Sequence, residues 1–162
     1  MRVLIVDDHS LFVESLRSLL TANGYQVVGT AGDGLAALEQ ARKLHPDLVL
    51  MDIAMPRCDG LAATRLIKAE MPDLRIVMLT ASEQDEPLFE AIKSGATGYL
   101  LKSLRAPDFL RQLAQIELGE PPLAPGLAFK ILQAFAQQPG LHAFYAGAAA
   151  QVIRHRTRAA SA

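Results

Sequence analysis

Apolar residues in the first 118 positions form two alternating patterns. Short apolar runs alternate with stretches in which apolar residues recur every three or four positions. The runs occupy residues 3–6, 26–31, 48–52, 76–80 and 99–102. A continuous apolar run of this length is typical of a strand buried on both faces, as in a parallel sheet. We therefore predict five strands, and the weaker apolar character of residues 26–31 places that strand nearer an edge.

Each run is followed by a stretch in which apolar residues have the spacing of a helix. The predicted helices lie within residues 11–20, 35–44, 62–67, 88–92 and 109–116. Gly24, Pro46 and Gly95 follow three of them and are typical helix stops. Strict alternation of strands and helices implies right-handed crossovers and a parallel sheet covered on both faces. The predicted fold is α/β: a flavodoxin-like, doubly wound, five-stranded parallel sheet.

The pattern changes after residue 118. Residues 119–126 are rich in Gly and Pro and predict a linker. We assign residues 119–138 to this linker, which is long enough for one short helix. Residues 139–162 are rich in Ala, lack acidic residues and have no clear period, so we expect an atypical tail that is flexible or helical.

Composition narrows the class of protein. Of 162 residues, 51% are hydrophobic, enough for a real core, and the net charge of −1 argues against a generic binder of polyanions. The single cysteine, Cys58, excludes a disulfide framework and a thiolate metal cluster. No stretch approaches the roughly 18 apolar residues of a membrane span, and the first residues do not form a signal peptide. The expected location is the cytoplasm.

Chemically useful residues follow four of the predicted strands. Asp7 and Asp8 follow the first strand and Asp52 ends the third, while Thr80 ends the fourth and Lys102 the fifth. Because the carboxyl ends of parallel strands lie along one edge of a sheet, we expect these five residues around one shallow site.

That group has a specific chemistry. Three crowded carboxylates raise one another's pKa unless a cation is present, and an all-oxygen site suits Mg²⁺ beside a phosphate. Lys102 and Thr80 could each hold a phosphoryl oxygen, which leaves Asp52 to attack an electrophilic phosphorus. Taken singly, the residues have ordinary explanations. The acids could cap helices, the lysine could be a solvated residue at a strand end, and the threonine could be present because it favours strands. His9 could be a zinc ligand, but we interpret it as a helix-start residue at the rim of the site.

The same residues resemble a known family. The resemblance covers residues 1–118, which we assign to a receiver domain, and rests on four motifs in this order: Asp7-Asp8-His9, Met51 to Pro56, Thr80-Ala81-Ser82 and Gly95 to Ser103. They resemble the receiver domain of two-component response regulators, in the branch that carries a LuxR/NarL-type helix-turn-helix. Ser103 stands where many receivers have Pro.

The resemblance implies roles for individual residues. Asp52 would be the phosphoacceptor, and Lys102 would bind the phosphate. Asp8, Asp52 and the backbone carbonyl of Ala54 would ligate Mg²⁺, with Asp7 acting mostly through a bound water. The chain would take up and slowly lose its own phosphoryl group without being a turnover enzyme.

The resemblance also implies a switch and partners. Thr80 and Tyr99 would be the switch pair, a sensor histidine kinase the phosphoryl donor, and a second receiver the partner in a phosphorylation-dependent homodimer. A LuxR-type output domain needs about 60 residues with a recognition helix. Residues 139–162 lack its pattern, so we expect no sequence-specific binding of nucleic acid by this chain.

Two alternative functions compete with this interpretation. A Mg²⁺-dependent phosphatase of the haloacid dehalogenase type needs a second acid two residues after its nucleophile, but Ala54 and His9 stand two residues after Asp52 and Asp7. The other alternative is a truncated DNA-binding transcriptional regulator, of which this chain would be a fragment.

Overall fold

The structure is a computed structural model that describes residues 1–81 and 90–120. The chain divides into two compact units, Met1–Pro122 and Leu123–Ala162, and the second lies outside the described residues. The predicted linker and tail, residues 119–138 and 139–162, also lie outside them except for Gly119 and Glu120. Their boundaries stay predictions.

Five parallel strands form a single sheet in the first unit. They are β1 (Arg2–Val6), β2 (Gln26–Ala31), β3 (Leu48–Asp52), β4 (Arg75–Thr80) and β5 (Gly98–Leu101). Their order is β2-β1-β3-β4-β5, with β3 at the centre and β2 at an edge. The predicted doubly wound, flavodoxin-like sheet is confirmed, including the position of the second strand.

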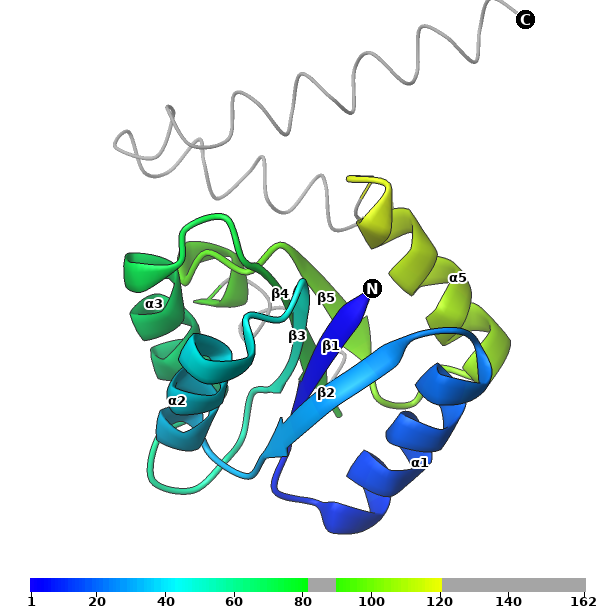
Figure 1. Ribbon diagram of the computed structural model, residues 1–162, viewed down its shortest axis with the longest axis horizontal. Coiled ribbons are helices and arrows are strands. Elements are labelled where there is room, and N and C mark those ends of the chain that lie inside the picture. The colour runs from blue at the N-terminus through cyan, green and yellow to red at the C-terminus, as the bar shows by residue number, and fades with distance from the viewer. Residues whose placement is uncertain (82–89, 121–162) are drawn as a thin grey trace, which may run out of the picture. The chain divides into compact units, whose positions relative to one another are not determined.

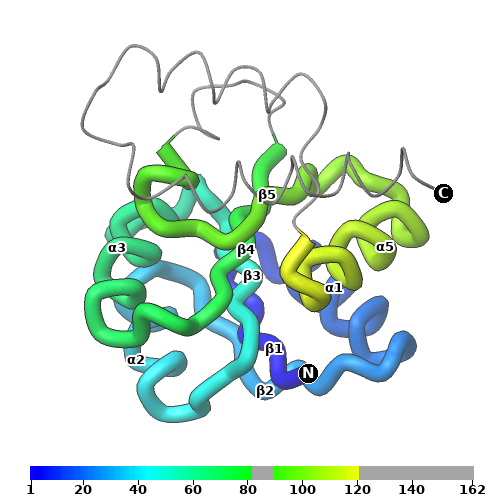
Figure 2. The backbone as a smooth tube through the Cα atoms, turned by 90° about the horizontal axis from the view of Figure 1, so that it is seen from above, coloured from blue at the N-terminus to red at the C-terminus, as the bar shows by residue number. Residues whose placement is uncertain are grey.

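Helices cover both faces of the sheet. They are α1 (Ser10–Ala22), α2 (Gly34–Leu44), α3 (Gly60–Glu70) and α5 (Ala106–Glu117). Residues 90–93 are helical as well and belong to the predicted fourth helix, whose earlier residues lie outside the described ranges. Helices α1 and α5 lie on one face and α2 and α3 on the other (Figures 1 and 2).

Side chains from the sheet alternate between two apolar cores. In β1, Val3 and Ile5 belong to the core under α1 and α5, whereas Leu4 and Val6 belong to the core under α2 and α3. The same alternation holds in β3, where all five residues are buried. Successive side chains of a strand point to opposite faces, so continuous apolar runs are what a sheet covered on both sides requires.

Local signals fix where the helices begin. The carboxylate of Asp33 accepts hydrogen bonds from the backbone N–H groups of Leu35 and Ala36, and Asp59 accepts one from Ala62. These aspartates satisfy backbone donors that have no partner within α2 and α3. Because the five strands of the sheet are parallel, the loops that lead from their carboxyl ends into the following helices gather at one edge of the sheet. Among the described residues, none of the helices is long and apolar enough to cross a membrane.

Candidate functional site

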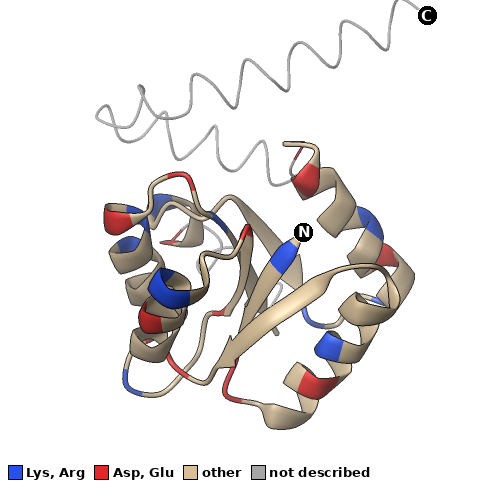
Figure 3. Ribbon diagram, viewed as in Figure 1, with Lys and Arg blue, Asp and Glu red and all other residues tan. Residues whose placement is uncertain are grey.

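The candidate site lies at the carboxyl edge of the sheet, where β1 and β3 end side by side. Val6 pairs with Met51, so the next residues, Asp7 and Asp52, are neighbours across the two strands. Both are nearly inaccessible to solvent, at 3% and 4% exposed. Acidic residues at the ends of β1 and β3 are marked red in Figure 3.

Lys102 joins the two buried carboxylates. Its Nζ lies 2.5 Å from Oδ2 of Asp7 and 3.0 Å from Oδ1 of Asp52. The alternation of side chains along each strand explains why these three groups lie together, because all three residues fall on the sheet face covered by α1 and α5. Lys102 directly follows the last residue of β5. The side chain also lies over the ring of Phe12 from α1, with Nζ 4.7 Å from the ring centroid.

Burial and charge act on these groups in opposite directions. Burial raises the pKa of the Asp52 carboxyl, and the negative charges of Asp7 and Asp8 add to that effect, while Lys102 opposes it. For Lys102, burial favours a lower pKa, but the hydrogen bonds from its ammonium to Asp7 and Asp52 outweigh it and raise the pKa. The lysine is therefore held as a cation between two carboxylates.

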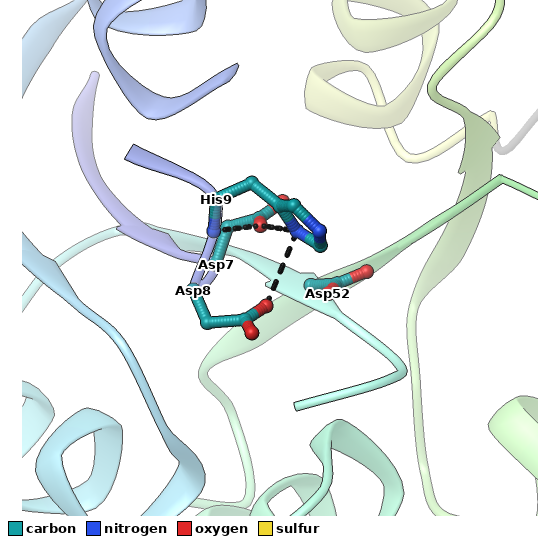
Figure 4. A group of neighbouring side chains, drawn as sticks. All are labelled: Asp7, Asp8, His9 and Asp52. Carbon is teal, nitrogen blue, oxygen red and sulfur yellow. Dashed lines mark hydrogen bonds and ion pairs between the residues drawn. The ribbon is translucent and has the colours of Figure 1, made fainter. Parts of the chain in front are cut away.

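Asp8 and His9 lie at the exposed rim of the site. Nδ1 of His9 is 3.0 Å from Oδ1 of Asp7 and 3.2 Å from Oδ1 of Asp8. Figure 4 shows the imidazole beside both carboxylates, with Asp52 across from them. The backbone N–H of His9 also donates to Asp7, at 2.9 Å. His9 precedes the first residue of α1, as predicted for a helix-start residue.

The donor set fits a divalent cation. One ligand atom from each of Asp7, Asp8, His9 and Asp52 lies within 4.8 Å of the others. Three of these four residues supply carboxylate oxygens, which are the donors that Mg²⁺ prefers. A cation here would also offset the excess of three carboxylates over the single ammonium of Lys102.

The two remaining predicted residues lie on the neighbouring strands. Thr80 is the last residue of β4 and is 5% exposed, and Tyr99 in β5 is half-buried. Tyr99 pairs with Met78, two residues before Thr80, and packs against the core under α2 and α3. Thr80 and Tyr99 therefore share the sheet face opposite to that of Asp7, Asp52 and Lys102.

Gly60, the first residue of α3, also shapes the site, and the sequence analysis missed it. A Cβ added to Gly60 would lie 2.0 Å from the carbonyl oxygen of Asp52. The N–H of Gly60 donates to the carbonyl of Ile53 at 2.9 Å, and the N–H of Ile53 donates to Leu79 at 3.2 Å. In the sequence, the Asp59-Gly60 pair predicts a turn, and a glycine immediately after a site loop can also signal close backbone approach.

Known proteins match this chain over most of its length. Residues 3–114 match the family model of the response regulator receiver domain. The transcriptional regulatory protein LnrK of Bacillus subtilis is 35% identical over 141 residues, 86% of this chain and 64% of LnrK. The response regulator GacA of Pseudomonas aeruginosa is 37% identical over 139 residues, 85% of this chain and 65% of GacA. The chain thus spans slightly less than two thirds of the length of these relatives.

Solved structures agree with the sequence matches. A two-component response regulator of the LuxR family from Aurantimonas sp. SI85-9A1 has a TM-score of 0.74 and is 31% identical, with 83% of this chain and 97% of that chain covered. The isolated receiver domain of RcsB from Salmonella enterica, determined with phosphomimetic BeF3-, has a TM-score of 0.70 and 26% identity, covering 79% of this chain and 96% of that one. Both place the sheet and helices described above among receiver folds.

Proposed function

The chain belongs to the response regulator receiver family, and from this premise we propose that Asp52 is the residue that accepts the phosphoryl group. The observation that carries the proposal is the position of its carboxylate: at the end of the central strand, 3.0 Å from the ammonium of Lys102 and beside Asp7. As a receiver domain of a two-component response regulator, the chain is a signalling domain rather than a metabolic catalyst.

In the proposed reaction, a carboxylate oxygen of Asp52 attacks the phosphorus of a small donor or of a phosphohistidine. The new O–P bond forms as the bond between phosphorus and the leaving group breaks. The ammonium of Lys102 stabilises the charge on the transferred phosphoryl oxygens, and the hydroxyl of Thr80 donates to another of those oxygens.

The proposed metal is Mg²⁺. Asp8, Asp52 and the backbone carbonyl of Ala54 would hold it, with Asp7 acting mostly through a bound water. When bound, the ion supplies positive charge that stabilises the transferring phosphoryl group. Ala54 cannot donate a hydrogen bond to an attacking water, so we expect the phosphoaspartate to be lost slowly, without turnover of an external substrate.

Partners follow from the same proposal. A sensor histidine kinase would donate the phosphoryl group, the chain would work in the cytoplasm, and Thr80 and Tyr99 would couple phosphorylation to homodimer formation. The relatives named as transcriptional regulators are longer than this chain, and we propose no sequence-specific binding of nucleic acid by residues 1–162.

Intact-mass spectrometry after incubation with acetyl phosphate and Mg²⁺ tests the assignment of Asp52. We expect the mass of one phosphoryl group to be added to the wild type, and none to Asp52→Asn or to wild type in a chelator. Asp73→Asn, which changes an exposed acid just before β4, should behave as wild type. Phosphorylation that persisted in Asp52→Asn would contradict the assignment.

A further inference from the structure

We propose that Arg57 is a positioning residue of the phosphorylation site, which acts by fixing the β3–α3 loop (residues 53–59) to the start of α2 through Asp33. The proposal rests on the proposed function, because the loop follows Asp52 directly and includes Ala54. Arg57 itself does not touch the carboxylates of the site in any described contact.

The first observation is the geometry of the Arg57–Asp33 pair. Two guanidinium nitrogens of Arg57 donate to the same oxygen of Asp33, Oδ2, with Nε at 3.0 Å. The other oxygen, Oδ1, accepts the N–H groups of Leu35 at 3.0 Å and Ala36 at 2.9 Å. One buried carboxylate therefore caps α2 with one oxygen and holds the β3–α3 loop with the other.

Both sets of donors act on the carboxylate in the same direction. The N–H of Ala36 and then the guanidinium of Arg57 lower the pKa of Asp33, so the carboxylate stays charged at neutral pH. A charged acceptor in a fixed helix cap is a firm attachment point for the loop, because its own rotamer is already determined by α2.

The second observation is the backbone of Arg57. Its φ is +64°, in the left-handed region that non-glycine residues with a branched or long side chain seldom adopt. Such a conformation persists where the surroundings over-determine it. Among the described contacts of the Arg57 side chain, the hydrogen bonds to Asp33 can hold this backbone conformation.

The third observation is that backbone hydrogen bonds hold the β3–α3 loop at two further places, beside the Arg57–Asp33 pair and at the end of the loop. The N–H of Gly34 donates to the carbonyl of Cys58 at 2.9 Å, and a Cβ on Gly34 would lie 2.6 Å from Sγ of Cys58. At the end of the loop, the N–H of Gly60 donates to Ile53. Between these attachments lies Ala54, whose carbonyl is the proposed metal ligand. Movement of Arg57 away from Asp33 would release the part of the loop that carries the Ala54 carbonyl.

An exposed ion pair often contributes little to stability, and the side chain of Arg57 is 72% exposed. The chain offers a matched control for that objection. Arg42 and Glu70 form another two-contact pair, between α2 and α3, in which both side chains are exposed and Nε of Arg42 lies 2.8 Å from Glu70. That pair is distant in sequence from the loop, and the hydrogen bonds and ion pairs described for Arg42 and Glu70 join them to each other rather than to the loop.

The test compares Arg57→Ala, Arg57→Gly and Asp33→Asn with Arg42→Ala. Asparagine at position 33 keeps an oxygen to cap α2 but loses the charge that holds Arg57. We expect all three loop variants to weaken Mg²⁺ binding, measured by isothermal titration calorimetry, by about threefold to tenfold, near the lower end of outer-shell effects. Arg42→Ala should leave it unchanged.

Amide chemical shifts of residues 53–55 in metal-free protein measure the position of the loop directly. They should move in the three loop variants and stay in place in Arg42→Ala. The double variant Arg57→Ala/Asp33→Asn should be no worse than either single variant, because both remove the same contact.

Three outcomes would overturn the proposal. They are unchanged shifts and Mg²⁺ affinity in the loop variants, additive losses in the double variant, and wild-type behaviour of Arg57→Gly, which would mean that only the left-handed backbone matters. If the loop variants behave as expected while wild-type Asp52 takes up no phosphoryl group, the proposed function fails and the positioning role of Arg57 stands.

Discussion

At the scale of single residues, Gly60 constrains Asp52, the proposed phosphoacceptor, through backbone contact alone. The nearest atoms to a Cβ at this position are the carbonyl oxygen of Asp52 at 2.0 Å and its carbonyl carbon at 2.9 Å. These are backbone atoms at the end of the central strand, so they cannot rotate away as a flexible side chain would. Any larger residue must move either α3 or the end of β3.

Gly60→Ala should therefore lower both stability and phosphorylation. We expect a loss of about 1–3 kcal/mol in the free energy of unfolding, typical of overpacking at a buried position, measured by urea denaturation. Phosphoryl uptake from acetyl phosphate should slow as well, because the carboxylate of Asp52 moves with its backbone.

Gly32→Ala provides the control for Gly60→Ala. A Cβ on Gly32 would meet nothing within 4 Å, so its effect should stay within about 0.5 kcal/mol, as for other unencumbered surface positions. Equal effects of the two substitutions would contradict the steric argument.

At the scale of elements, the last turn of α5 is tied to the amino edge of the sheet. The hydroxyl of Tyr25, just before β2, donates to Oε2 of Glu117 at 3.0 Å. Arg75, the first residue of β4, donates from Nη1 to the carbonyl oxygen of Glu117 at 3.2 Å. The carboxyl end of α5 is therefore held by Tyr25 and by the start of β4, on the side of the domain opposite the candidate site.

Tyr25→Phe should loosen that end of α5 and remove part of the protein's sensitivity to alkali. Burial first, and then the hydrogen bond to Glu117, raise the pKa of Tyr25 to about 12. Because the folded pKa lies above the unfolded value, the contribution to stability is complete below pH ~10 and is lost as the pH rises toward 12. The net loss at neutral pH should be about 0.5–1.5 kcal/mol, the usual value of one hydrogen bond.

Urea denaturation at neutral and alkaline pH measures the effect of Tyr25→Phe. The stability difference between wild type and variant should shrink above pH ~10. Glu117→Gln, which keeps an acceptor but removes the charge, should lie between the two proteins. A difference that grew with pH would contradict the assigned hydrogen bond.

Elements were more predictable from the sequence than contacts between them. The strands at residues 26–31 and 48–52 were predicted with the bounds that the structure has, because apolar runs report burial directly. The proximity of Asp7, Asp52 and Lys102 followed from parallel topology. Two contacts could not be predicted in this way: the position of Phe12 beside Lys102, and the link between Arg57 and Asp33. Each depends on rotamers and on loops that meet from distant parts of the chain. Neither leaves a periodic signal.

At the scale of the whole domain, the proposed phosphoacceptor lies at the end of the central strand and the proposed switch at the edge. Thr80 ends β4, and Tyr99 lies in the edge strand β5, half-buried against the core under α2 and α3. A phosphoryl group that drew the hydroxyl of Thr80 inward would change the space available to the Tyr99 ring. We predict that the surface altered in this way includes β5 and α5.

Sedimentation with Mg²⁺ and beryllofluoride tests whether that change favours pairing of two receivers. We expect the wild type to shift from monomer toward dimer, and Thr80→Ala to shift less. The size of the shift is limited by the difference in affinity of the phosphoryl mimic for the two states. An unchanged mass for the wild type, with Thr80→Ala behaving identically, would contradict the coupling.

The complete burial of β3 has a consequence for what fixes its register in the sheet. A strand with one apolar face loses its core contacts when it slides by one residue, so folding itself rejects the slide. Strand β3 is apolar on both faces, and a slide would exchange Leu50 and Met51 between two cores that both accept large aliphatic side chains. It would, however, carry Asp52 away from Lys102. The register of β3 is therefore fixed by the charged contact at its carboxyl end, between Asp52 and Lys102, more than by its apolar pattern.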